Sequence, residues 1–400
     1  MTDQTKTDEL GAPATGPRGR LETVDMLRGL VMVVMALDHL RDFFHVDALN
    51  FDPSDPTQTS LALFMTRFVT HFCAPTFVFL SGASVWFQLQ RGKGKPALSR
   101  FLLSRGIWLI LLEVLVVSLA IGLRPGLFFL QVIWCIGLGM LLLSALIWLP
   151  RGISLALGAV IVVGHGLLAL VPLEQFGALA PVVALATRPG LVPVGVGLFI
   201  LYPFLAWIGI MLLGYGLGPV FLMDKARRTR WLLMLGSGAV AAFLIIRGLN
   251  GYGDPAPWKA QADGLRTAMS FFQISKYPPS LAYTLITLGP ALLMLLALER
   301  LKGPAAKVLV TFGRVPLFYY LLHFFAAHLL AAAVGVAMGY PFSAFVWGPA
   351  GPDAQALQGW GFPLGVVYLI WIAVVAALYP LCLWWAGLKA RRNDWWLSYL

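Results

Sequence analysis

One end of the first long apolar segment carries charged and titratable residues whose spacing would suit acid–base chemistry. Asp38, Arg41, Asp42 and His45 recur at steps of three and four, which places them along one stripe of a helix. His39 meets Asp42 at a spacing of three. A carboxylate beside an imidazole fixes its tautomer and raises its basicity, as a general base requires. The segment therefore predicts a catalytic group of Asp38, His39, Asp42 and His45, which His71 of the next apolar segment is expected to join.

Part of this group has an ordinary explanation. It lies toward the outer end of the predicted helix, where charged side chains reach the membrane surface, and Arg41 would neutralise the two aspartates. For Arg41 and Asp42 this interpretation competes directly with a functional one. Titratable groups inside a membrane helix are costly and are functional candidates by default. That argument favours function for Asp38 and His39, which lie about a turn deeper in the helix.

Two other apolar segments carry histidines. His71 lies near the outer end of the second segment, shortly before Pro75, and by itself fits a kinked packing helix with a satisfied histidine. Tyr319 and His323 share a helix face at a spacing of four. His323 and His328 are five residues apart, which turns them about 140° from one another. One of that pair is therefore predicted to be structural, and His323 is kept as the functional one.

Arg28 lies near the inner end of the first segment, where it would either extend to the headgroups or meet an anionic group from the cytoplasm. Glu113 is expected to form a helix–helix hydrogen bond, and His165 to pack. The sequence contains no phosphate-binding loop, G-x-S-x-G elbow, HExxH or CxxC motif. The histidines lack a clustered ligand pattern, so no metal site is predicted.

The composition shows what must position these residues. Hydrophobic residues make up 59% and charged residues 12% of the 400-residue chain, against about 45–50% and about 25% in soluble domains. A bilayer core needs about 20 apolar residues per helix. We therefore predict an all-α, polytopic membrane bundle of about ten helices in one domain (residues 23–400), after a disordered cytoplasmic tail (residues 1–22). The predicted spans are 24–45, 62–88, 101–122, 127–149, 153–172, 195–222, 231–249, 279–299, 308–338 and 362–387.

The basic residues give the bundle a direction. Far more Lys and Arg fall in the segments that are inside when the N-terminus is cytoplasmic than in the opposite loops, which predicts that both termini are cytoplasmic. The net charge of +11 is explained by this topology, so nucleic acid is not an expected partner. Two predicted outer loops are long, at 46–61 and 250–278, and the second contains Lys276 and Tyr277. Long loops without regular structure tend to be functional.

Three short motifs carry a resemblance to a known family. They are VDMLRG at 24–29, APTFVF at 74–79 and GRVPLFYY at 313–320. With them the chain resembles bacterial members of the heparan-alpha-glucosaminide N-acetyltransferase catalytic-domain family, within the transmembrane acyltransferase superfamily. The resemblance implies an enzyme that takes an acyl group, usually acetyl, from cytoplasmic acetyl-CoA and delivers it across the membrane. Related O-acyltransferases have an arginine and a histidine eleven residues apart in the first helix, as Arg28 and His39 are here.

The chain also departs from the family pattern. In the glucosaminide enzyme an asparagine matches His39 and an aspartate matches His71, and its outer-loop catalytic histidine has only a loose counterpart in His45. These differences leave the amino-sugar acceptor open. Whether the acyl group rests on His39 or passes directly to the acceptor also stays open. The expected cofactor-binding residues are Arg28, Arg314, Tyr319 and His323, and the expected substrate-binding residues are Arg41, Lys276 and Tyr277.

The sequence thus predicts a multi-pass acyltransferase of the bacterial inner membrane, with acetyl-CoA as donor and an extracytoplasmic glycan or other cell-envelope acceptor. The alternative is a proton-coupled transporter that uses Asp38, His39, His71 and His323 as a relay. A third interpretation is a structural membrane subunit, which would leave the titratable groups without a purpose. The expected partners are membrane lipids and the acceptor, and self-association is left open.

Overall fold

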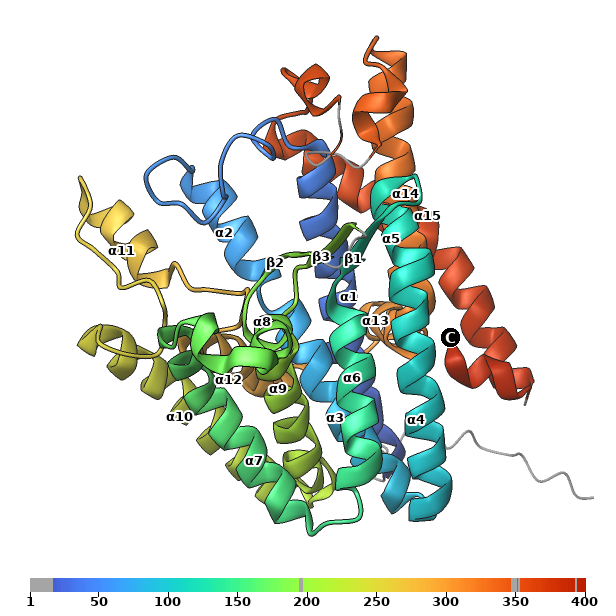
Figure 1. The fold of residues 1–400 in the computed structure, drawn as a ribbon. Coiled ribbons are helices and arrows are strands. Elements are labelled where there is room, and N and C mark those ends of the chain that lie inside the picture. Colours follow the sequence, from blue (N-terminus) through green and yellow to red (C-terminus); the bar gives the residue numbers. More distant parts are fainter. Residues whose placement is uncertain (1–16, 194–196, 347–350, 352, 393) are drawn as a thin grey trace, which may run out of the picture.

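The computed structural model describes residues 17–193, 197–346, 351, 353–392 and 394–400, and it is a bundle of helices (Figure 1). The predicted all-α membrane bundle is confirmed. Within the described residues, eight helical segments are long and apolar enough to cross a bilayer. They are Leu61–Gln90, Lys95–Gly122, Arg151–Leu170, Phe204–Leu222, Lys225–Leu249, Leu281–Leu298, Pro316–Ala337 and Leu364–Arg391.

Two more helices take the places of the remaining predicted spans. Helix α1 (Pro17–Phe44) is long enough, but its charged residues keep it out of the apolar set. Helix α6 (Val132–Leu146) is apolar but shorter than a full span. Helix α1 runs through the middle of the bundle and packs against α3, α13, α14 and α15 (Figure 1). It includes the last six residues of the predicted tail, whereas residues 1–16 lie outside the described residues.

Two predicted spans are broken in the structure. The segment 62–88 divides into α2 (Leu61–Thr70) and α3 (Cys73–Gln90), with Pro75 in the first turn of α3. Proline lacks an N–H group and therefore fits the first turn of a helix, where that group has no partner within the helix. The segment 308–338 divides at Val315, just before Pro316, because a residue that precedes proline is driven out of helical geometry. The resulting helices are α13 (Pro304–Arg314) and α14 (Pro316–Ala337).

Two other predicted spans begin with strands. Residues 127–149 open with β1 (Leu127–Leu130), and residues 195–222 contain β3 (Gly197–Ile200) before α9 (Phe204–Leu217). With β2 (Gly190–Pro193) they form a small sheet of order β1-β3-β2, in which β1 is parallel and β2 antiparallel to β3. The other helices of eight or more residues are α4 (Lys95–Leu112), α7 (Arg151–Gly164), α8 (Ala180–Thr187), α10 (Lys225–Leu249), α11 (Gly264–Phe272), α12 (Leu281–Leu298) and α15 (Leu364–Arg391). A π-helix (Glu113–Val117) joins α4 to α5 (Ser118–Gly122).

Glycines allow α1 and α13 to touch backbone to backbone. A Cβ atom on Gly29 would lie 1.8 Å from the carbonyl oxygen of Leu309, and one on Gly313 would lie 1.9 Å from that of Asp25. Both distances are far below any real contact, so neither position accepts a larger residue without a shift of the helices. Small residues at helix contacts are the usual means of close packing in membranes. This contact fixes the depth at which α13 lies beside the charged residues of α1.

Candidate active site

A buried ion cluster lies where α1, α2 and the loop before α12 meet. The Asp38 carboxylate accepts two hydrogen bonds of 2.9 Å from Arg67 and one of 2.7 Å from the Thr70 hydroxyl. Arg41 lies 2.8 Å and Lys276 3.4 Å from the same carboxylate. One carboxylate therefore faces three cations in this cluster. Arg67 and Thr70 are additions to the predicted site, and the available signal was a lone arginine in an otherwise uncharged apolar helix.

His39 has a different partner from the one predicted. Asp38 is occupied by the cations, and the Asp42 carboxylate lies 2.5 Å from Arg41, so neither hydrogen-bonds to the imidazole. Instead, Nδ1 of His39 lies 2.7 Å from Nε2 of His323 on α14. Successive helical residues are turned by about 100°, so Asp38 and His39 address different neighbours although they are adjacent. The predicted carboxylate–imidazole pair is thus replaced by a pair of imidazoles.

A small enclosed space adjoins this pair, which we call the central chamber. Its volume of about 10 Å³ is room for about one water molecule. His39 and Asp38 form part of its wall, and Tyr320 and Lys276 close it from other helices. The remaining lining residues are Met35, Thr70, Cys73, Ala74, Gln131, Val132 and Tyr202.

An outer cavity of about 310 Å³ also has Lys276 in its wall. Lys276 lines both spaces and therefore forms part of the wall between them. Tyr277, Arg67 and His71 also line the outer cavity. His71 lies at the break between α2 and α3 and is buried, and among the described residues its Nδ1 has no hydrogen-bond partner. The predicted residues His71, Lys276 and Tyr277 thus come together here, while Arg41 and Asp42 border an adjacent open hollow that shares Arg67.

His45 is not brought to this cluster. It follows the last residue of α1, and its Nδ1 accepts a hydrogen bond of 3.1 Å from the Asp47 amide. Burial lowers the pKa of His45, against an opposing effect of Asp47. Glu113 accepts a 3.0 Å hydrogen bond from the Trp134 amide in the first turn of α6, in line with the predicted helix–helix role. His165 lies 3.0 Å from the Ile161 carbonyl and 3.2 Å from the Val162 carbonyl one turn earlier, also interacts with the Pro279 backbone, and packs, as expected.

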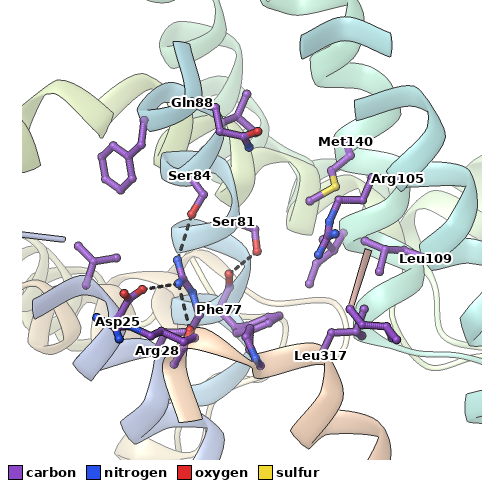
Figure 2. A pocket seen from close by; sticks show the side chains of 18 of the residues that line it. Asp25, Arg28, Phe77, Ser81, Ser84, Gln88, Arg105, Leu109, Met140 and Leu317 are labelled. Atoms are coloured by element: carbon purple, nitrogen blue, oxygen red, sulfur yellow. Dashed lines mark hydrogen bonds and ion pairs between the residues drawn. The ribbon is translucent and has the colours of Figure 1, made fainter. Parts of the chain in front are cut away.

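A larger inner cavity of about 530 Å³ opens at the other end of α1 (Figure 2). Arg28 lies in its wall and donates hydrogen bonds to Asp25 at 2.8 Å, Ser84 at 3.0 Å and the Gly313 carbonyl at 3.3 Å. Figure 2 shows the guanidinium held between α1 and α3 at the edge of the open space. Three partners thus fix Arg28 in the cavity wall, rather than leaving it to extend freely to the headgroups.

The wall of the inner cavity is strongly basic. Asp25 is the one acidic side chain among the described lining residues. Arg314 is 56% exposed at the side chain and lies near the mouth. Tyr319 and His323, predicted with Arg28 and Arg314 as cofactor-binding residues, do not line this cavity, because they are buried deeper in α14. The wall contains three more cations, which were not among the predicted site residues: Arg91, Arg105 and Lys389.

The inner cavity and the central chamber follow one another along the same helices. On α14, Leu317 lines the cavity and Tyr320 lines the chamber. On α3, Phe77 lines the cavity and Ala74 lines the chamber. Three residues of helix rise by about 4.5 Å. On these two helices the residues that line the two spaces are therefore about one helical turn apart. On α1 the corresponding residues, Arg28 and Met35, are seven positions apart, so the separation differs from helix to helix.

The catalytic-domain pattern of heparan-alpha-glucosaminide N-acetyltransferase matches residues 20–249, more than half of the chain. The chain belongs to the heparan-alpha-glucosaminide N-acetyltransferase catalytic-domain family. It is accordingly a membrane-embedded, multi-pass acetyltransferase of that family. No curated protein matches the chain.

The matched region of this acetyltransferase carries Arg28, Asp38 and His39 on α1 and His71 at the break between α2 and α3. His323, which bonds to His39, and Lys276, which contacts Asp38, come from the chain beyond the match. The site therefore combines groups from the matched region with groups supplied by the later helices. Within the described residues, no three His, Cys, Asp or Glu side chains are grouped as metal ligands.

Proposed function

We propose that this acetyltransferase takes an acetyl group from acetyl-CoA in the inner cavity and transfers it to an acceptor that enters from the outer cavity. One observation carries the proposal: the basic inner cavity and the polar outer cavity approach the same histidine-bearing chamber from opposite sides. An enzyme that joins two substrates from opposite faces of a membrane needs such an arrangement. A transporter would need a single site that opens alternately to each side.

The inner cavity suits the donor. CoA is a polyanion, and Arg28, Arg105 and Arg314 offer guanidinium groups that bind phosphate through paired hydrogen bonds. Deeper in the cavity the walls become apolar at Phe77 and Leu317. A phosphate-bearing head would bind at the basic mouth, and the narrow pantetheine arm would extend along the apolar wall. The thioester would then lie at the end of the cavity nearest the central chamber.

The chamber presents the base for the reaction, and it would widen to admit the reacting groups. His39 would remove the proton from an acceptor hydroxyl or amine as that group attacks the thioester carbon. A C–O or C–N bond forms, the C–S bond breaks, and the proton passes by way of His39 to the sulfur of CoA. Negative charge develops on the carbonyl oxygen during attack, and Lys276 and Arg67 supply positive charge beside the chamber.

The outer cavity suits a polar acceptor. His71 lines this cavity with a buried Nδ1 that has no partner among the described residues, so a turn of the ring would let it hydrogen-bond an incoming group. Tyr277 provides an aromatic face for a sugar-like ring. The basic loops indicate that the inner cavity faces the cytoplasm, where acetyl-CoA is made. We therefore propose an extracytoplasmic glycan or other cell-envelope molecule as the acceptor, and the bacterial inner membrane as the location.

The test uses the full chain in proteoliposomes with labelled acetyl-CoA on the side of the basic loops. His39→Ala and His71→Ala should insert normally and lose transfer to a mixed cell-envelope acceptor extract on the opposite side. His165→Ala is the matched control, because this histidine lines neither of the two cavities nor the central chamber. Full activity in both the His39→Ala and the His71→Ala variant would show that neither histidine belongs to the active site. Solute movement without any CoA would instead favour transport.

A further inference from the structure

The proton positions on the two paired imidazoles follow from what each nitrogen faces. Nδ1 of His323 lies 2.9 Å from the carbonyl oxygen of Tyr319, one turn earlier on α14. A carbonyl oxygen only accepts hydrogen bonds, so Nδ1 of His323 must carry the hydrogen. A neutral imidazole has one N–H group. Nε2 of His323 is therefore a lone-pair acceptor.

That acceptor determines the state of His39. Its Nδ1 lies 2.7 Å from Nε2 of His323, and such a distance requires one of the two nitrogens to donate. Because Nε2 of His323 accepts, Nδ1 of His39 carries the hydrogen and Nε2 of His39 keeps its lone pair. If His323 instead donated to His39, it would need hydrogens on both of its ring nitrogens. That would place a cation at a fully buried position to which no carboxylate bonds within the described part of the chain.

The ring geometry supports this bond. The planes of His39 and His323 are inclined by only 10°, and their centroids lie 5.0 Å apart. That separation is about the nitrogen-to-nitrogen distance plus the two ring radii, so the rings meet edge to edge, as a linear N–H···N bond requires. Phe324 lies against His39 with centroids 4.1 Å apart, and Tyr319 packs along the His323 ring at 5.1 Å. These contacts hold both rings in place.

The ring edge of His39 that carries Nε2 is not bonded to His323. His39 is half-buried and lines the central chamber, while its Nδ1 edge is turned to His323. Within the part of the chain that the structure describes, no hydrogen bond to Nε2 of His39 is present. We infer that His323 is a positioning residue, which holds the proton of His39 on Nδ1 and leaves Nε2 as the basic atom for acetyl transfer. This inference rests on the proposed function.

The same bond acts during the reaction. When Nε2 of His39 takes the acceptor proton, the imidazole becomes a cation whose Nδ1–H still donates to His323. The bond then becomes charge-assisted and stronger, so it stabilises the transition state more than the resting state. The proton leaves Nε2 for the sulfur of CoA, and the pair returns to its starting state. His323 itself touches neither substrate in this scheme.

The experiment compares His323→Leu with His323→Gln in single-turnover acetyl transfer. Leucine removes the acceptor, so we expect the rate to fall on the order of 100-fold or more, as for loss of a general base, with unchanged acetyl-CoA binding. Glutamine restores both roles, because its oxygen accepts from Nδ1 of His39 and its NH₂ group donates to Tyr319. We expect it to retain the rate within about tenfold. His328→Gln is the matched control: it lies on the same helix and is equally buried, but it bonds to the carbonyls of Ala120 and Phe345.

A second measurement does not depend on activity. Nitrogen-15 spectra of histidine-labelled protein should show His39 with an unprotonated Nε2 in the wild type, and a mixture of tautomers in His323→Leu. A protonated Nε2 in the wild type would overturn the inference, as would equal losses in the Gln and Leu variants or an unaffected Leu variant. Wild-type protein that transfers no acetyl group at all would overturn the proposed function instead, whatever the tautomer.

Discussion

Removal of the single carboxylate among three cations should be far more costly than removal of one of the cations. Asp38→Asn keeps the size of the side chain but deletes the charge that faces Arg41, Arg67 and Lys276. Breaking a buried ion pair typically costs about 3–5 kcal/mol, because the remaining charge stays buried and unpaired. We therefore expect Asp38→Asn to lower the free energy of unfolding by about that amount.

The matched variant is Lys276→Met, which keeps the apolar stem and removes the most distant of the three cations, at 3.4 Å. Asp38 retains its bonds to Arg67 and Thr70 and its ion pair with Arg41. One hydrogen bond contributes about 0.5–1.5 kcal/mol net, so the loss should be about 1 kcal/mol. The decrease in the unfolding midpoint should thus be several times larger for Asp38→Asn than for Lys276→Met.

The protein contains its own unfolding probe. Cys73, Cys135 and Cys382 are free and buried, so a dye that fluoresces on reaction with thiols reports their exposure on heating in detergent. The wild type and both variants can be compared at equal protein and dye concentrations. Equal decreases in midpoint for Asp38→Asn and Lys276→Met would show that the carboxylate is not the centre of the cluster, and would refute the argument.

Three further predictions concern other parts of the chain. Arg28→Gln should raise the KM for acetyl-CoA about 10–100-fold, the value of a hydrogen bond to a charged group, with a smaller effect on kcat. Gly313→Ala should lower the thermal midpoint markedly because its Cβ would collide with α1, whereas Gly238→Ala, in open space, should not lower it. Burial alone would raise the pKa of Asp55, but hydrogen bonds from neighbouring loop residues hold it below its usual value. The stabilisation that these hydrogen bonds give to the loop is therefore present at pH values above the ordinary pKa of an aspartate, and it is lost as the pH falls through the lowered pKa of Asp55. Amide-exchange protection at Thr57 should decrease only in that acidic range.

The sequence predicts the membrane bundle well because it depends on composition and segment length, which are local properties. It also identifies Asp38 and His39, since a titratable group within an apolar helix needs an explanation wherever that helix packs. The partner of His39 could not be found in this way. His323 is 284 residues away, and helical periodicity gives the face of a residue but neither its depth nor its neighbour.

Competition between charges was a second obstacle. The spacing that brings His39 near Asp42 also brings Arg41 near both aspartates, and an arginine binds a carboxylate more strongly than a neutral imidazole does. Arg67 adds to this competition from another helix. The breaks at His71 and Val315 were missed for a different reason. Both breaks lie inside long, mostly apolar segments, and Pro75 and Pro316 mark the change in geometry.

The separation of the inner cavity from the central chamber has a further consequence for the cell. Phe77 and Leu317 give the cavity an apolar surface on the side of the chamber, over which a hydrated ion would lose its water without compensation. An enzyme built this way would keep the membrane potential intact during each turnover. A small uncharged acetyl group would need to travel only about one helical turn along α3 and α14. The chemistry would then be vectorial, driven by the thioester and not by an ion gradient.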